Sequence, residues 1–423
     1  MIGKLILASI LTGLITGFFI TFYELLIVFM TYFIFMGDPL KTIPTLPTWY
    51  LYFVPTVAIF LVNYLASKDN NIKEYGVSEI ADSITENRMI LKVKTLFFKV
   101  IASALSLSSG FTVGTEGPSA SIGAMIAYQI HKLFKLPTML IKMMISVGAS
   151  AGVAAIFVSP LTGIAFAIEN IAYQFIKQYV TYLILASVIA FAITANYLDA
   201  ITFSHPAGRT MNNEYIVANL FFIPFITAFI YFYLFLKKKV LHFIDIEVFK
   251  KFHNYRNHIF ALLGGSVIGT ILLIEPQAAF SGKEIVVMLM NQENHISVLL
   301  IFTIIFLRII GTTVAIYSNA VGGVFLPLMS IGALIGYGFG ELMTHYIFAV
   351  EPFYFAAIGA SIFMGVIMKL PLTAVILSLE TTFDYNVVIA SGVSVVLVEY
   401  FSNIYFNIRK SYVNKADKIE RTS

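Results

Sequence analysis

Cysteine is absent from this chain of 423 residues, charged residues make up only 12% of it, and tryptophan occurs once. The absence of cysteine excludes disulfide bonds and thiolate-ligated metals. An ordinary soluble domain contains about 25% charged residues, so the scarcity of charge argues against a water-soluble core. The seven histidines are scattered without ligand spacing, and no metal or other cofactor is expected.

Long apolar runs are abundant instead, and hydrophobic residues account for 59% of the chain. A helix needs about 20 apolar residues to cross a bilayer. Several runs approach or exceed this length, at 5–35, 50–65, 179–195, 216–236, 259–274, 298–316 and 387–404. The first is too long for the apolar region of a secretory signal peptide. The pattern predicts an all-α integral membrane protein that crosses the lipid bilayer many times.

Basic residues indicate which loops face the cytoplasm, where Lys and Arg are enriched. One basic stretch runs from Lys237 to Arg256, and another lies in the tail between Arg409 and Arg421. Both stretches, and both termini, are expected on the cytoplasmic side of a plasma or inner membrane. The tail ends soon after the last apolar run, so no soluble regulatory domain is expected. The net charge of +4 does not indicate a nucleic-acid partner.

Two motif pairs recur at almost one separation. Residues 114–118 (Gly-Thr-Glu-Gly-Pro) precede a Ser-Ile-Gly-Ala run, and 209 residues later 323–327 (Gly-Val-Phe-Leu-Pro) precede the same run. Pro-Leu-Thr followed by a glutamate nine residues after the proline occurs at 160–169 and again, 211 residues later, at 371–380. Small residues favour helix packing in membranes and would explain either run alone. They do not explain a shared offset, which indicates a duplication.

The chain is therefore predicted to be a single transmembrane domain over 1–423, with related halves at about 1–205 and about 214–423. Halves of duplicated membrane proteins are commonly related by an inverted pseudo-two-fold axis. In such proteins the substrate lies at broken helix ends near the midplane. Inverted-topology repeats of tilted and broken helices are expected here.

Both copies of the first motif are suited to hold an anion. Proline is favoured in the first turn of a helix, and glycine lets the backbone approach a ligand closely. The first N–H groups of a helix lack partners, and the helix dipole adds partial positive charge there. Such a helix start is an anion site made of backbone. The candidate anion-binding residues are Gly114, Thr115 and Gly117 in one half and Val324, Phe325 and Leu326 in the other.

Glu116 lies inside the first copy of this motif, and the second copy has no acid. A carboxylate within the membrane is costly and marks a functional site by default. Ionised, it would occupy the anion site itself, and protonated, it would leave the site to a free anion. Glu116 is therefore predicted to be a gate and a proton carrier. The alternative is a glutamate that caps its own helix, which stabilises by about 0.3–1 kcal/mol, although a structural role should have appeared in both halves.

Glu169 and Glu380 do appear at matched places in both halves. Symmetric acids more often tie helices together than carry substrate. Both are predicted to be structural, with substrate carriage as the alternative.

Together these motifs resemble those of the CLC family of chloride channels and chloride/proton antiporters. Residues 114–118 resemble the family's G-[KR]-E-G-P segment, which carries the gating glutamate. Residues 323–327 resemble its G-x-F-x-P segment, whose backbone amides and phenylalanine line the central chloride site, and 371–380 resemble a further family segment. The resemblance implies a prokaryotic-type homodimer in which each subunit has its own anion pathway.

Two departures from the family pattern concern the anion. The family's G-S-G-I-P segment matches residues 74–79, where Tyr75 replaces the serine and Gly76 follows. A phenol can still donate a hydrogen bond, but its bulk must point differently, so the preferred anion stays open. Thr115 stands where the family has a basic residue before the gating glutamate, which removes a nearby cation.

A further departure concerns the proton. Asn170 stands where many family antiporters carry a second, inner glutamate, and asparagine carries no titrating proton. The proton then takes another route, or the coupling is weak. The resemblance also implies a pore tyrosine in the last stretch, for which Tyr412 is preferred over Tyr405. For either tyrosine a membrane-interface aromatic is the alternative.

Two transport mechanisms stay open. Glu116 favours a proton-linked chloride antiporter, which is the mechanism we expect, whereas Asn170 favours a passive gated channel. An intramembrane hydrolase built on Ser119 or Ser121 would need a base within hydrogen-bond reach. No histidine stands in a matched arrangement, so an enzyme is not expected. The expected partners are chloride or a similar small anion, protons and lipid.

Overall fold

Helices make up almost all of the described structure. The computed structural model describes residues 1–69, 72, 93–170, 176–201, 213–244, 256–290, 296–347 and 349–420. Within these ranges, eight segments are helical, long and apolar enough to cross a membrane. The same ranges contain no β-strand, only one isolated antiparallel bridge between Gly114 and Gly323. The prediction of an all-α, multi-pass membrane protein is confirmed.

The helices differ greatly in length, and several are too short to cross a bilayer alone. In chain order the α-helices are α1 (Ile2–Ile34), α2 (Pro39–Thr42), α3 (Thr48–Lys68), α5 (Val93–Ser108), α6 (Glu116–Leu133), α7 (Ile141–Phe157), α8 (Pro160–Asn170), α9 (Ile176–Thr194), α10 (Asn213–Ile244), α12 (Arg256–Ile274), α13 (Lys283–Met290), α14 (Val298–Tyr317), α15 (Phe325–Tyr346), α16 (Pro352–Met368), α17 (Pro371–Thr382) and α18 (Tyr385–Glu420). Short 3₁₀ helices lie at η1 (Ile43–Thr45), η3 (Thr138–Leu140) and η5 (Pro276–Ala278).

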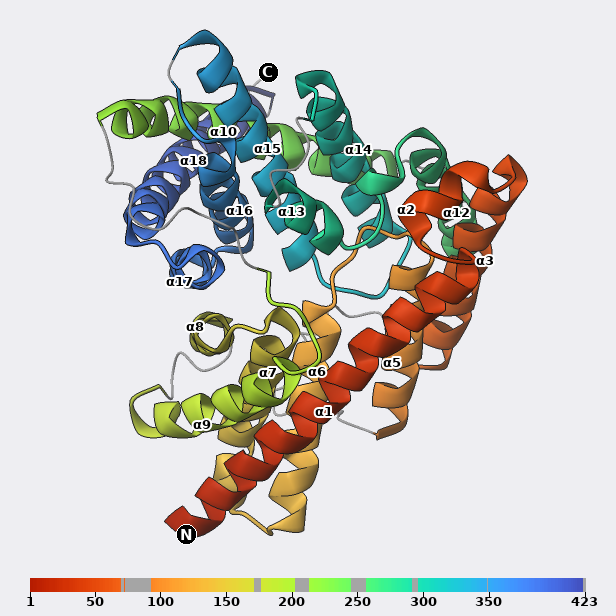
Figure 1. Ribbon diagram of the computed structural model, residues 1–423, viewed down its shortest axis with the longest axis vertical. Helices are drawn as coiled ribbons and strands as arrows, with labels where there is room; N and C mark the ends of the chain where they lie inside the picture. The colour runs from red at the N-terminus through yellow and green to blue at the C-terminus, as the bar shows by residue number, and fades with distance from the viewer. Residues whose placement is uncertain are drawn as a thin grey trace.

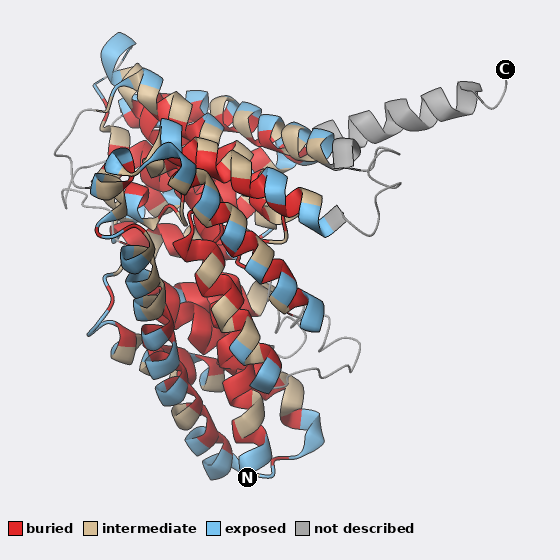
Figure 2. Ribbon diagram, turned by 90° about the vertical axis from the view of Figure 1, so that its right-hand side faces the viewer, coloured by how far each residue is buried: buried red, intermediate tan, exposed pale blue. Residues whose placement is uncertain are grey.

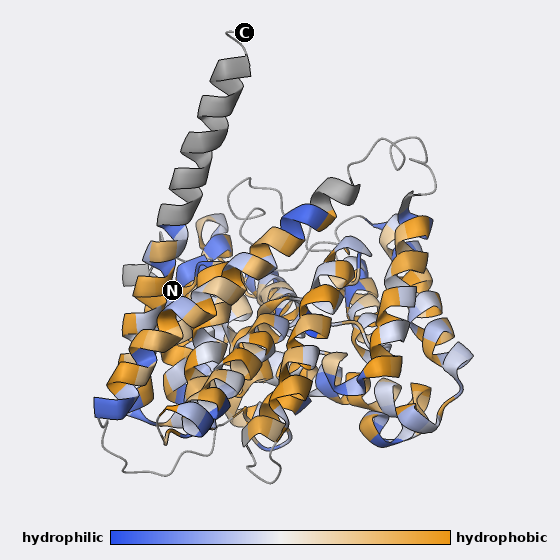
Figure 3. Ribbon diagram, turned by 90° about the horizontal axis from the view of Figure 1, so that it is seen from above, coloured by the Kyte–Doolittle hydropathy of each residue, from blue (hydrophilic) through white to orange (hydrophobic). Residues whose placement is uncertain are grey.

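The outer helices are apolar where they are exposed, as a lipid solvent requires. On α1 the exposed face carries large side chains such as Phe18, Phe22 and Phe29. Its inner face is built on small residues, because a Cβ on Gly13 or Gly17 would run into backbone carbonyls of α9. Figure 3 shows apolar residues distributed over the outer helices, and Figure 2 shows the buried residues concentrated in the interior.

Matched helices in the two halves pack in the same way. Helix α6 lies against α7, and α15 lies against α16. A Cβ on Gly123 would meet the carbonyl of Gly148, and a Cβ on Gly332 would meet that of Gly359. These close glycine contacts stand at equivalent places in the two halves, so the Ser-Ile-Gly-Ala repeat forms a tight helix crossing twice.

The chain also leaves α7 and α16 in the same manner. Val158 and Lys369, which follow these helices, both adopt the left-handed conformation, with φ of 51° and 58°. A left-handed residue ends a helix and lets its last carbonyls find partners. The next helices, α8 and α17, then begin at Pro160 and Pro371. The second repeated motif is therefore a sharp break followed by a short helix.

Helices α8 and α17 contact each other where the two halves meet, and they run antiparallel. Glu169 near the end of α8 bonds to the start of α17, while Glu380 near the end of α17 bonds to the start of α8. Reciprocal contacts between equivalent residues are what a two-fold axis produces. In Figure 1, α6–α9 gather in the lower part and α15–α18 in the upper part, with α8 facing α17.

Candidate anion-binding site

The loops before α6 and α15 pair at the centre of the molecule. The N–H group of Gly114 donates to the carbonyl of Gly323, and the N–H group of Gly323 donates to that of Gly114, both at 2.7 Å. The two glycines stand at equivalent places in the repeated motifs, so this bridge pairs the two copies. A Cβ on either glycine would overlap the Glu116 carboxylate, so glycine at both positions lets the carboxylate lie against the bridge. The bridge brings the starts of α6 and α15 together.

Each of these helix starts lacks a side-chain cap. Thr115 precedes α6 and Val324 precedes α15, and neither side chain accepts a hydrogen bond from the helix that follows. The first-turn N–H groups are therefore available to an acceptor from elsewhere. Gly114 itself is engaged by the bridge, so its N–H group serves the pairing of the two loops.

Glu116 supplies that acceptor to α15. Its Oε1 accepts a hydrogen bond from the N–H group of Phe325 at 2.6 Å, across the interface between the halves. Only 1% of the residue is exposed, and Oε2 has no hydrogen-bond partner among the described residues. A negative group thus occupies the positive end of α15.

Aromatic rings enclose the other side of this helix start. The Phe325 ring lies 4.5 Å from that of Phe157 at the end of α7 and 6.2 Å from that of Phe166 in α8, between ring centroids. The Phe325 side chain is fully buried. The positive edges of aromatic rings are compatible with an anion. Phe325 was predicted from its motif, but Phe157 and Phe166 were not, although Phe157 stands just before the repeated Pro-Leu-Thr break.

Hydroxyl groups from α5 and α1 approach the same centre. Ser106 Oγ accepts a hydrogen bond at 3.0 Å from the N–H group of Val321, just before the paired loop. Ser103 Oγ and Tyr23 Oη share a hydrogen bond of 2.5 Å. Glu116 also exerts an electrostatic influence on the Tyr23 hydroxyl. These residues have no motif in the sequence that could have revealed them.

Glu169 and Glu380 each hold the start of the other half's short helix. Glu169 accepts hydrogen bonds from the backbone N–H groups of Leu372 at 2.7 Å and Thr373 at 2.8 Å, and from the Thr373 hydroxyl at 2.6 Å. The Glu169 carboxylate thus accepts three hydrogen bonds at the start of α17.

The matched bonds of Glu380 complete the pair. It accepts from the backbone N–H groups of Leu161 at 2.9 Å and Thr162 at 2.6 Å, from the Thr162 hydroxyl at 2.8 Å, and from Ser159. Here two carboxylates occupy helix N-termini in the way that anions do, and they join the halves.

A protein-family model matches most of the chain. The model described as "Voltage gated chloride channel" matches residues 55–403. The chain belongs to the voltage-gated chloride channel family. Two curated relatives are H(+)/Cl(-) exchange transporters named ClcA, from Citrobacter koseri (26% identity over 355 residues) and Salmonella arizonae (27% over 357 residues). In both cases the match covers 81% of this chain and 73% of the relative.

Solved structures of this family share the fold. A slow cyanobacterial Cl−/H+ antiporter superposes with a TM-score of 0.80 at 22% identity, over 94% of this chain and 93% of that one. A CLC-type fluoride/proton antiporter superposes with a TM-score of 0.76 at 19% identity, over 96% of each chain. The resemblance to the CLC family and its helical fold is therefore confirmed.

The structure describes only some of the other residues that were predicted from the family pattern. Tyr75 and Gly76 lie outside the described residues. Tyr405 and Tyr412 both lie in α18, but their side chains are outside the described part of the structure. Asn170 is the last residue of α8, and its Nδ2 is buried without a hydrogen-bond partner among the described residues.

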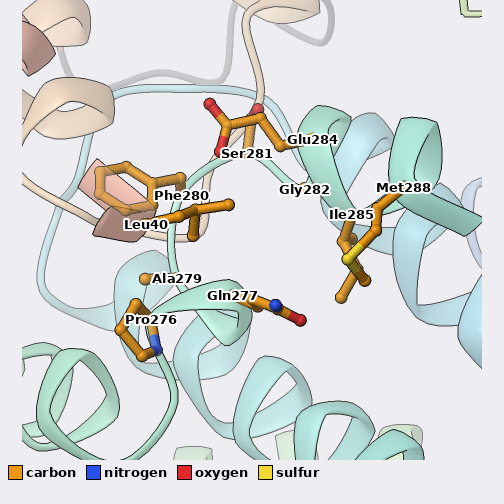
Figure 4. Close-up of a pocket in the computed structure, with 10 residues that line it drawn as sticks. All are labelled: Leu40, Pro276, Gln277, Ala279, Phe280, Ser281, Gly282, Glu284, Ile285 and Met288. Atoms are coloured by element: carbon orange, nitrogen blue, oxygen red, sulfur yellow. The ribbon is translucent and has the colours of Figure 1, made fainter. Parts of the chain in front are cut away.

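A separate pocket lies between the loop after α12 and α13. Figure 4 shows its lining, which includes the apolar side chains of Leu40, Phe280, Ile285 and Met288 together with Glu284. Desolvation by burial, reinforced by Asp38, raises the pKa of Glu284, and Lys283 partly offsets the rise. None of the lining residues belongs to the repeated motifs, and a carboxylate in the lining does not favour an anion.

Proposed function

We propose that this protein transports chloride or a similar small anion across the membrane in exchange for protons, with Glu116 as both gate and proton carrier. The position of the Glu116 carboxylate is the main support for this proposal. It takes a hydrogen bond from Phe325 at the N-terminus of α15, where a free anion would otherwise bind. One site therefore serves the carboxylate and the anion in turn.

Protonation decides which of the two occupies the site. The ionised carboxylate is a strong acceptor for the Phe325 N–H group, because hydrogen bonds to charged groups are roughly twice as strong as neutral ones. A neutral carboxylic acid is a weaker acceptor and yields this donor to chloride. Each arrival of an anion then accompanies the uptake of a proton by Glu116. With Thr115 before it, no basic side chain at that neighbouring position competes for the carboxylate.

The relatives support exchange rather than passive conduction. The similar curated proteins are named as proton/chloride exchange transporters, and two of the similar solved structures are described as proton-coupled antiporters. The alternative is a passive gated chloride channel with little proton coupling. Asn170 favours that alternative, because the inner position has no group that can carry a proton.

A transporter fits the site better than a hydrolase. The hydroxyl of Ser119 donates at 2.8 Å to the carbonyl of Thr115 in its own helix, as hydroxyls in apolar helices commonly do. That geometry directs the hydroxyl proton to the backbone and not to a catalytic base. We therefore assign no catalytic residue.

The assembly and orientation follow from the family and from charge. We infer a homodimer with one anion pathway in each subunit, since the chain belongs to a family with that architecture. Lys237, Lys238 and Lys239 at the end of α10 and the basic C-terminal tail favour a cytoplasmic location for these ends and for both termini. The two halves, about 1–205 and 214–423, are proposed as the inverted repeats of one domain.

Flux measurements in liposomes test the proposal. Chloride efflux and external pH should be recorded together for the wild-type protein and for Glu116→Gln. Exchange predicts that chloride leaving the vesicles draws protons inward, and that Glu116→Gln abolishes the proton signal. Wild-type chloride efflux without any pH change would assign the passive channel instead.

A further inference from the structure

A buried polar stripe follows one face of α5 from the end of α3 to the centre of the molecule. Its members are Thr95, Lys99, Ser103 and Ser106, all no more than 4% exposed. Residues three or four apart lie on one face of a helix, and these four fall on a single narrow face. In Figure 1, α5 lies alongside α1 and α3, which contact it. Four polar residues on the packed side of an apolar helix need an explanation.

The outer members of the stripe have partners at both ends. At its start, the Thr95 hydroxyl donates to Asp69 Oδ2 at 2.5 Å, just after α3. At the other end, Ser106 accepts a hydrogen bond from the N–H group of Val321 just before the paired loop. One turn earlier, Ser103 bonds to Tyr23, whose hydroxyl is influenced electrostatically by Glu116. Between Thr95 and Ser106 the helix rises about 16 Å, roughly half of the hydrocarbon thickness of a bilayer. The stripe thus connects an acid near one face of the membrane with the gate at the middle.

The acid end of the stripe faces the cytoplasm. Lys68 and Lys94 flank the connection between α3 and α5, and that connection contains Lys73, Arg88 and Lys92 in sequence. By the positive-inside rule such a loop is cytoplasmic. Asp69 is half-buried at this end, which gives it contact with both the stripe and the cytoplasmic solution.

We propose that Asp69, Lys99 and the Tyr23–Ser103 hydroxyl pair carry protons along α5 between the cytoplasm and Glu116, in place of the acid missing at Asn170. This inference rests on the proposed proton-linked transport and names its inner proton route. Successive members are one helical turn apart, about 5–6 Å between Cβ atoms, which a side chain or one bridging water spans.

Each group on this route can accept a proton and release one. The neutral carboxyl of Glu116 gives its proton to the hydroxyl pair, in which either oxygen can act as donor, and the pair releases a different proton to Lys99. Lysine, unlike arginine, can give up a proton inside a protein and take one back, so Lys99 gives a proton to ionised Asp69 and regains one from the hydroxyl pair. Asp69 releases it to water, and every side chain returns to its starting state after one proton has crossed.

The other acid that interacts with Tyr23 is already paired. Glu24 also interacts with Tyr23, but its carboxylate forms an ion pair with Lys283 at 3.7 Å. Lys283 is the first residue of α13, which is not part of the stripe. The hydroxyl of Tyr23 is therefore the link between the stripe and the gate.

Coupled fluxes in liposomes test this route, with Asp69→Asn and Tyr23→Phe as the main variants and Asp38→Asn as the control. Asp38 is an acid in the exposed loop that caps α2, far from the stripe in sequence. We expect Asp69→Asn to lower the number of protons moved per chloride by about 100-fold, the lower range of what a positioned proton-transfer group contributes. Tyr23→Phe removes only a hydroxyl, so it tests the route even if the charge-changing variant folds poorly.

Variants of Lys99 distinguish a lysine that carries protons from one that only supplies a positive charge. Lys99→Arg keeps the positive charge but cannot release a proton, so the route predicts that Lys99→Arg and Lys99→Met both lose proton movement. Coupling retained in Lys99→Arg would reduce Lys99 to a counter-charge and overturn its place in the route. Wild-type coupling in both Asp69→Asn and Tyr23→Phe would overturn the route alone, whereas a wild-type protein that moves no protons would overturn antiport as well.

Discussion

Removal of the Glu116 carboxylate should make chloride bind more tightly. In the structure this group accepts a hydrogen bond at 2.6 Å from the Phe325 N–H group, and chloride must displace it to use the same donor. Hydrogen bonds to charged groups contribute about 1.5–3 kcal/mol, and each 1.4 kcal/mol is a tenfold change in affinity. Chloride must overcome the free energy of this Glu116–Phe325 hydrogen bond to bind. Glu116→Ala should therefore lower the apparent Kd for chloride by about 10-fold to about 150-fold.

Calorimetric titration of purified protein with chloride, in a buffer of a large non-binding anion, measures this change. Glu116→Gln should fall between the wild type and Glu116→Ala, because a neutral amide oxygen still accepts the bond but more weakly. Glu214→Ala removes an exposed acid at the start of α10 and is the matched control. Lower pH should tighten binding in the wild type and leave Glu116→Ala unchanged. Equal affinities for the wild type and Glu116→Ala would refute competition for one site.

Three further changes test the framework that holds the site. Glu380→Gln should lower the free energy of unfolding by about 1–3 kcal/mol, because the charge-assisted hydrogen bonds to the start of α8 weaken. Thermal melting in detergent measures this loss, with Glu214→Gln as the control. Gly332→Ala should destabilise the protein by about 1–3 kcal/mol, because the added methyl group meets a backbone carbonyl of α16. Gly392→Ala is its control and should melt like the wild type, because a methyl group there makes only an ordinary contact. Arg308→Gln should cost about 2–4 kcal/mol by leaving buried carbonyls of the η5 loop without their donor, and an unchanged melting temperature would contradict this.

The sequence predicted the features that repeat. Apolar runs are long and need only hydropathy to be recognised, and the duplicated motifs at 114–118 and 323–327 carried the position of the candidate site. The short helices α8 and α17 were marked by their shared Pro-Leu-Thr rather than by hydropathy, because 11 or 12 residues are too few for a spanning run.

Other features depend on contacts that no local pattern encodes. Glu116 bonds across to α15, although a residue in the first turn of α6 could equally have capped its own helix. Phe157 and Tyr23 look like any other aromatic residue in an apolar segment until the fold places them beside Phe325 and Ser103. Asp69 is similarly ordinary in sequence, because its relation to α5 arises only when α3 packs against that helix.

The most direct test of proton-linked anion transport is whether a proton gradient alone moves chloride uphill. Liposomes with equal chloride inside and outside, and with the membrane potential clamped at zero, should be given a pH difference while internal chloride is followed. Proton-linked exchange predicts net chloride movement against its developing gradient, and no such movement in vesicles that contain Glu116→Gln. Chloride that stays at equilibrium in wild-type vesicles, while still running down an imposed chloride gradient, would contradict exchange and leave a passive pathway.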